Sequence, residues 1–100
     1  MQINVHARHI NTNEERVREE VERALDRFAD RITRVEVFLQ DVNAGKGGDD
    51  KQCTLEARPR GLDPVAAEHM AAVAMEAVTG AAGKLERMLN TRFGRLEGHR

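Results

Sequence analysis

The sequence predicts a small α+β domain in which a strand and a helix are followed by two or three further strands and a closing helix. Three stretches alternate apolar and polar residues, which is typical of strands with one buried face. Two others repeat apolar residues at three and four positions, which is typical of amphipathic helices. The length of 100 residues, 40% of them hydrophobic, suits a single domain spanning residues 1–100.

Charge and cysteine content narrow the classes of function. The chain has 16 Lys and Arg residues against 17 Asp and Glu, so its net charge of −1 gives no overall attraction to nucleic acid. Any such binding must come from a local patch. The single cysteine excludes an internal disulfide and a cysteine-based metal site. No apolar run is long enough for a signal peptide or a membrane span, so we expect a cytoplasmic protein without a membrane partner.

The first strand and helix follow from residues 2–32. Residues 2–9 alternate, and the inward side chains are Ile3, Val5 and Ala7. Thr12 and Glu15 have the spacing of a capping box, in which each side chain satisfies a free backbone donor of the first helical turn. We expect a helix from about Asn13 to Asp30. Its buried stripe consists of Val17, Val21, Leu25, Phe28 and Ile32.

A second strand follows after a short turn at residues 30–34. Its inward side chains are Val35, Val37 and Leu39, and Phe38 is the apolar exception among the outward ones. Strand, helix and strand have similar lengths of roughly 23–27 Å, which predicts a βαβ unit with parallel strands. The glycine-rich stretch 41–51 lacks the spacing of a phosphate-binding loop and precedes a strand, so we predict a hairpin connection.

The segment after the third strand has two interpretations. The third strand covers residues 52–58, with Cys53 facing the core, and ends at Pro59 and Gly61. The alanine-rich stretch that follows favours a helix, yet an unbroken helix from Pro64 to Leu96 would be about 50 Å long, twice the length of the strands. Either glycines interrupt it, or residues 65–70 form an edge strand and the helix begins near Val73.

The closing helix is clearer from Val78 onward. Its predicted apolar stripe consists of Val78, Ala81, Ala82, Leu85, Met88, Leu89 and Leu96. Small residues, including Gly80 and Gly83, cluster in its first turns. They allow the backbone to lie close to the sheet or to the first helix.

A distributed pattern is shared with one known protein family. It is carried by the opening MQINVHARHI, the helix exit RFADRITRVEVFL, the third strand KQCTLEARPRG and the closing AVTGAAGKLERML, in which small residues precede a Lys-Leu-x-Arg run. In these segments, which cover most of the chain, the sequence resembles the family of ribosome hibernation-promoting factor and ribosome-associated inhibitor A, also known as sigma-54 modulation proteins.

The resemblance implies a β-α-β-β-β-α fold, similar to a double-stranded-RNA-binding domain with an added strand. In that fold a four-stranded mixed sheet carries two helices packed on one face, and residues 65–70 form a strand. It also implies a protein that sits on the small ribosomal subunit, in the channel for messenger and transfer RNA, and blocks translation under stress or in stationary phase. Because the sequence stops at Arg100, the resemblance leads us to expect the short form, without the C-terminal domain that pairs two ribosomes.

Basic residues at helical spacing are the candidates for contact with ribosomal RNA. They are Arg16, Arg23, Arg27 and Arg31 on the first helix and Lys84, Arg87 and Arg95 on the second. A competing interpretation pairs them with neighbouring acids as ordinary exposed helix charges. The acids that could do so are Glu19, Glu20, Glu22 and Glu86.

The histidines and Phe38 are the remaining candidates for a metal site or a binding contact. His6 and His9 are three apart on a predicted strand, hence on opposite faces, so we expect no metal site. We also expect no cofactor and no enzymatic activity, because no nucleophile, carboxylate pair or cofactor motif is visible. Phe38 is either a stacking platform for a base or a dimer contact. The alternative function is therefore a protein-interaction module of the same fold, a monomer or weak homodimer, without ribosome affinity.

Overall fold

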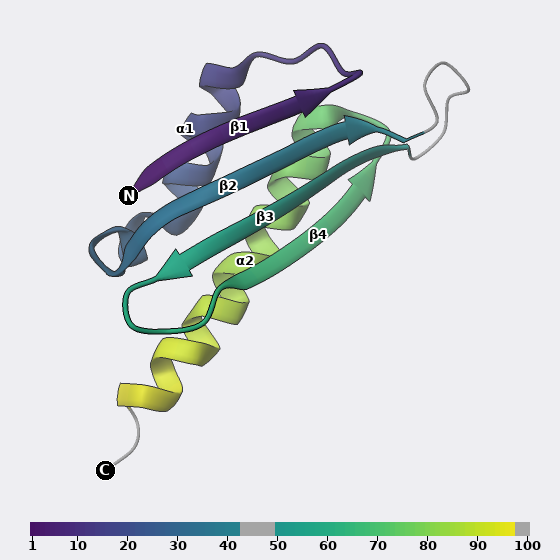
Figure 1. Ribbon diagram of the computed structural model, residues 1–100. Coiled ribbons are helices and arrows are strands. Elements are labelled where there is room, and N and C mark those ends of the chain that lie inside the picture. Colours follow the sequence, from purple (N-terminus) through teal and green to yellow (C-terminus); the bar gives the residue numbers. More distant parts are fainter. Residues whose placement is uncertain (43–49, 98–100) are drawn as a thin grey trace.

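The computed structural model describes residues 1–42 and 50–97, with side chains to residue 94, and it confirms the predicted α+β class (Figure 1). The elements are β1 (Gln2–Arg8), α1 (Glu14–Leu25), the 3₁₀ helix η1 (Asp26–Arg31), β2 (Ile32–Asp41), β3 (Lys51–Pro59), β4 (Val65–Ala71) and α2 (Ala74–Glu97). The order is therefore β-α-β-β-β-α, with a short 3₁₀ segment extending the first helix.

The four strands form one mixed sheet in the order β1-β2-β3-β4. β1 and β2 are parallel, as the predicted βαβ unit requires, and the other two pairs are antiparallel. The predicted hairpin is confirmed by the antiparallel register of β2 with β3 and by the bond from Val42 N to Asp50 O at 2.9 Å. The rest of that glycine-rich stretch, residues 43–49, lies outside the described residues. β1 and β4 are the edge strands of the sheet.

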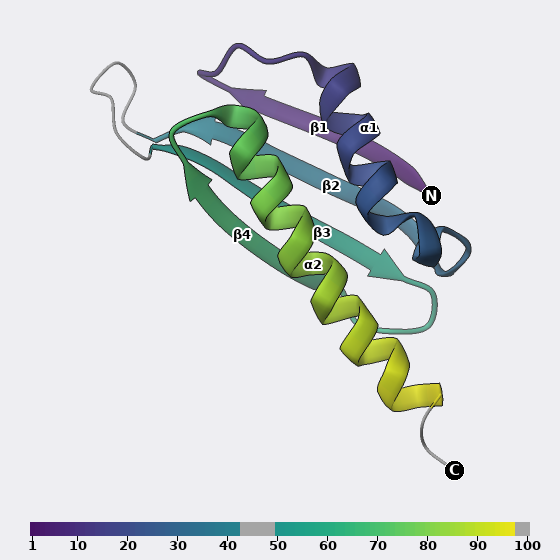
Figure 2. The same cartoon turned by 180° about the vertical axis from the view of Figure 1, so that it is seen from behind.

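Both helices cover the same face of the sheet, and the other face is open (Figure 2). α2 packs on β3 and β4, while α1 packs on β1 and against α2. The buried core lies between the two layers and includes the predicted Leu25, Phe28, Val78, Leu85 and Leu89 and the inward positions of β2 and β3. Cys53 is fully buried there, as predicted.

The inward side of β1 is less buried than predicted. Ile3 and Val5 are only partly covered, although both pack against the core, and Ala7 is exposed. The reason is that β1 is an edge strand, and α1 lies over its N-terminal part in both views (Figures 1 and 2). From α1, Arg18 Nε donates a hydrogen bond of 3.4 Å to the carbonyl of Ile3.

Two details at the ends of the first helix differ from the prediction. Asn13, not Thr12, is the N-cap, because its backbone is extended and its Oδ1 accepts a hydrogen bond from Arg16 N at 3.2 Å. The α-helix ends at Leu25, and the 3₁₀ turns of η1 replace its expected last turn. β2 then begins at Ile32, three residues earlier than predicted, with an irregularity in register between Ile32 and Arg34.

The ambiguous segment is a strand. Residues Val65–Ala71 pair with β3, and α2 starts at Ala74 and continues without a break through Gly80 and Gly83. At Gly80 an added Cβ would lie 2.1 Å from the His69 ring, so the predicted close approach to the sheet is confirmed there. At Gly83 it is wrong, since the nearest atom would be Arg87 Nη1 at 3.7 Å.

The predicted stripe of α2 needs one correction. Met88 is 43% exposed, because it lies outside the inward arc that Leu85 and Leu89 share. Phe93, which was not on the predicted stripe, is buried against Phe28, with ring centroids 5.4 Å apart. The side chain of Leu96 lies outside the described residues.

Candidate functional site

Acids and bases alternate over the outer surface of the helical layer. α1 alone carries five glutamates and three arginines in its sequence EERVREEVERAL. The predicted cations therefore do not form a continuous basic stripe. Their individual partners decide which of them are available to a ligand.

Two of the predicted RNA-binding residues form ion pairs, as the competing interpretation expected. Arg23 binds Glu20 through two hydrogen bonds, the shorter 2.8 Å from Nη2 to Oε2. Arg27 forms an ion pair with Glu86, which connects η1 to α2 across the groove between the helices. Glu19 and Glu22, by contrast, form no ion pair within residues 1–42 and 50–94. Of the four acids named by the competing interpretation, Glu20 and Glu86 thus form the expected ion pairs and the other two do not within these residues.

Arg31 packs against a buried aromatic ring. Its guanidinium lies 4.0 Å from the centroid of the Phe93 ring, so it covers the end of the core with a cation–π contact. The side chain is only partly exposed. It adds positive charge to this end of the molecule but has less freedom to reach a ligand than the exposed arginines.

Lys84 and Arg87 are brought together on the outer face of α2. Both are exposed, and with Met88 and Thr91 they line a shallow depression of about 350 Å³. Lys84 Nζ donates to the backbone carbonyl of Glu68 in β4 at 2.9 Å, and it forms no ion pair with a carboxylate of the described side chains. Arg87 forms no ion pair in the part of the chain that the structure describes. The side chain of Arg95 lies outside that part.

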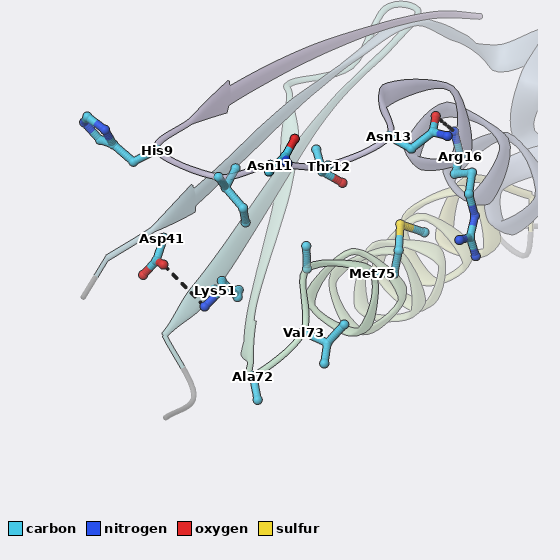
Figure 3. Close-up of a pocket in the computed structure, with 12 residues that line it drawn as sticks. His9, Asn11, Thr12, Asn13, Arg16, Asp41, Lys51, Ala72, Val73 and Met75 are labelled. Carbon is cyan, nitrogen blue, oxygen red and sulfur yellow. Dashed lines mark hydrogen bonds and ion pairs between the residues drawn. The ribbon is translucent and has the colours of Figure 1, made fainter. Parts of the chain in front are cut away.

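Arg16 lies beside a cavity of about 560 Å³ (Figure 3). The cavity is lined by the segment between β1 and α1, by the first residues of α2 and by Lys51. The Lys51 ammonium is 3.3 Å from Asp41 and 2.7 Å from Asp50, and the hydrogen bond to Asp50 raises the pKa of Lys51. No sequence pattern predicts this cavity, because its residues come from distant segments.

The open face of the sheet carries an aromatic pair over a polar network. Phe38 is 46% exposed, and its ring stacks on His6 with centroids 4.9 Å apart and planes 16° apart. Glu36 holds this arrangement, since its carboxylate accepts hydrogen bonds from His6 Nε2 at 2.7 Å and from Asn4 Nδ2 at 2.9 Å. Arg34 lies 3.1 Å from the same carboxylate.

These contacts give Glu36 a role in acid stability. The hydrogen bond from His6, followed by that from Asn4, lowers the pKa of Glu36 below its ordinary value of 4.5. The stabilisation is therefore complete above pH 4.5 and is lost as the pH falls through the lower folded-state value. We expect Glu36→Gln to be less stable than the wild type at pH 7 and the difference to shrink at pH 3. Urea denaturation at both pH values measures this; a difference independent of pH would contradict it.

His9 follows the end of β1 instead of belonging to the strand, with a left-handed φ of 55°. Among the described residues no three His, Cys, Asp or Glu side chains are grouped so that they could hold a metal ion. Burial raises the pKa of the Cys53 thiol to about 12, so it remains protonated. No helix in the described part of the chain is long and apolar enough to cross a membrane.

The structure is a small α+β domain, with charged helices on one side and a polar sheet face with an aromatic pair on the other. The chain belongs to the family described as Sigma 54 modulation protein / S30EA ribosomal protein, whose sequence model matches residues 3–97. The family resemblance identified in the sequence is thereby confirmed. No curated protein sequence is similar enough to the chain to count as a match.

Solved structures show the same fold. A ribosomal subunit interface protein from Coxiella burnetii superposes with a TM-score of 0.75 at 18% identity, over 94% of this chain and 99% of that one. The N-terminal domain of Protein Y from Thermus thermophilus gives 0.71 at 23% identity, over 92% and 99%. The architecture of a four-stranded mixed sheet with two helices on one face is thus common to all three.

Proposed function

We propose that this protein binds the small ribosomal subunit through the outer face of its helical layer and inhibits translation under stress or in stationary phase. The observation that carries the proposal is the pair Lys84 and Arg87 on α2, both exposed and without a carboxylate partner among the described side chains. Such cations suit the phosphates of ribosomal RNA. Family membership over residues 3–97 supports the choice of partner.

The remaining cations of this face can add to the contact. Arg23 and Arg27 are 70% and 55% exposed, and an exposed ion pair contributes only about 0–1 kcal/mol to folding. Exchanging a carboxylate for a phosphate therefore costs these arginines little. Arg16 belongs to the first turn of α1 and is exposed, so it can contribute a further contact at that end of the helix.

Attraction to RNA must be local, because the net charge of −1 provides none at long range. About four phosphate contacts would give a slope of about −3 in a plot of log affinity against log salt concentration, at 0.7 to 0.9 per contact. Binding should thus weaken steeply between low and physiological salt. A salt-independent affinity would indicate a contact with ribosomal protein instead.

Reversing Lys84 and Arg87 together to glutamate is expected to abolish co-sedimentation with purified small subunits at low salt. The matched control is Arg58→Glu with Arg60→Glu, which changes the net charge equally but lies on the open sheet face and in the turn after β3. The control should still co-sediment. Each protein is also centrifuged alone, and thermal unfolding of the variants should stay close to the wild type, because exposed helix charges contribute tenths of a kcal/mol.

Three outcomes would refute the proposal. Failure of the wild-type protein to co-sediment at low salt would remove the ribosome as partner and leave the interaction-module interpretation. Equal binding by the Lys84 and Arg87 double variant would show that the helical face is not the contact. Equal loss in both double variants would mean that overall charge, and not this surface, controls binding.

A further inference from the structure

Two adjacent rows of side chains cross the open sheet face at register positions. The first row is His6, Phe38 and Thr54, and the second is Arg8, Gln40 and Gln52. All six side chains belong to β1, β2 and β3 and line a shallow depression of about 700 Å³. The helices pack on the opposite face, and of α1 the first residue, Glu14, also lines the depression. Lys84 and Arg87 lie on α2, so this surface differs from the one proposed to bind the small subunit (Figures 1 and 2).

The first row offers a flat apolar surface. Phe38 is half-exposed, and the stack with His6 fixes its ring, because His6 is itself held by Glu36 at 2.7 Å. Its neighbour on β3 is the short side chain of Thr54, which leaves room beside the ring. An ordered, half-exposed aromatic ring on a sheet is suited to stack with a nucleobase, whose π-face needs no particular sequence.

The second row supplies hydrogen-bonding groups and a positive charge. Gln40 Nε2 donates to Gln52 Oε1 at 2.9 Å, and Gln52 Nε2 donates to Glu68 at 2.8 Å, so both amides are held in place. Within the described residues, the Arg8 guanidinium has no hydrogen bond or ion pair. Arg8 lies two residues from His6, about 7 Å along the strand, a separation that one nucleotide spans between its base and its phosphate.

We propose that this face binds single-stranded RNA, with a base stacked on Phe38, its edge near the amides of Gln40 and Gln52, and a phosphate at Arg8. The exposed Arg8, which forms no ion pair with a described residue, can contact a phosphate of single-stranded RNA without giving up another partner. A second copy of the chain fits less well, because the face around Phe38 is dominated by polar pairs such as Arg58 with Glu56, and stable interfaces have an apolar centre.

The proposal is tested by fluorescence anisotropy with a labelled single-stranded RNA decamer of mixed sequence at low salt. The background is the Lys84→Glu, Arg87→Glu variant, which removes the helical cations from the measurement. Phe38→Ala should weaken binding roughly 5- to 100-fold, whereas Phe38→Trp should retain it and show quenching of its fluorescence by the stacked base. Arg8→Ala should weaken binding and reduce the salt slope by about 1.

The matched control is Val73→Ala, which shortens an exposed apolar side chain in the turn between β4 and α2, away from the two rows. It should leave RNA affinity unchanged. Equal affinity of Phe38→Ala and the parent would overturn the proposal. A second outcome would also overturn it: the parent binds no RNA but self-associates in sedimentation velocity, and Phe38→Ala abolishes the self-association. That result would assign the face to a second copy of the chain. Neither result depends on co-sedimentation with small subunits, so the two proposals fail separately.

Discussion

Replacing Phe28 with alanine is expected to lower the free energy of unfolding by about 3–5 kcal/mol, a large part of the 5–15 kcal/mol that is typical of a domain. The ring is 5% exposed and packs from η1 against Phe93 of α2, at 5.4 Å between centroids. The Arg27 guanidinium lies over it at 4.7 Å. Removing the ring would leave a cavity that these neighbours, held on two different elements, cannot easily fill.

Phe38→Ala is the matched control for this loss. The same atoms are removed from a ring that is 46% exposed, so the change in the free energy of unfolding should stay below about 1 kcal/mol. Urea denaturation followed by far-UV circular dichroism measures both variants. A loss below about 1 kcal/mol for Phe28→Ala would mean that η1 does not seal the core in solution.

Gly80→Ala is expected to destabilise the protein by about 1–3 kcal/mol, although alanine favours helix. Its Cβ would lie 2.1 Å from Cδ2 and 2.5 Å from Cγ of His69, so the whole imidazole ring between β4 and α2 would have to move. In a His69→Ala background the same substitution should be neutral or stabilising, because the obstruction is gone. Denaturation of the four proteins of this cycle gives the coupling directly.

Gly83→Ala provides the internal comparison for Gly80→Ala. At position 83 the added methyl would meet only Arg87 Nη1 at 3.7 Å, an ordinary contact with a flexible side chain. The gain in helix propensity should then stabilise the protein by up to about 1 kcal/mol. If both glycine variants behave alike, the close approach of α2 to β4 at Gly80 is not what selects glycine.

Periodicity was sufficient to predict most of the fold. Alternation located β1, β2 and β3, and the spacing of Val17, Val21 and Leu25 located α1, because one face of each element is buried. It failed where composition and tertiary context conflict. Residues 65–71 are rich in alanine, and only their pairing with β3 makes them a strand, which local propensity cannot register.

The candidate site was less accessible to sequence reasoning, because partners that decide its chemistry are remote in the chain. Arg27 and Glu86 are 59 residues apart. The sequence could therefore suggest that they pair, but it could not show whether Arg27 is paired or available to a ligand. The rows on the open face depend on register between three strands, which no local pattern specifies. Phe38 alone was visible, as an apolar residue among outward positions.

The edge strands of the sheet bear on how the protein avoids aggregation. An uncovered edge is a template on which another chain can extend the sheet, and natural proteins often block it with charged side chains, lysine in particular. Here each helix places one long basic side chain on the backbone of the nearer edge: Arg18 on the carbonyl of Ile3 in β1, and Lys84 on that of Glu68 in β4. Each of these cations therefore lies on an edge strand, where a charged side chain disfavours the addition of another strand.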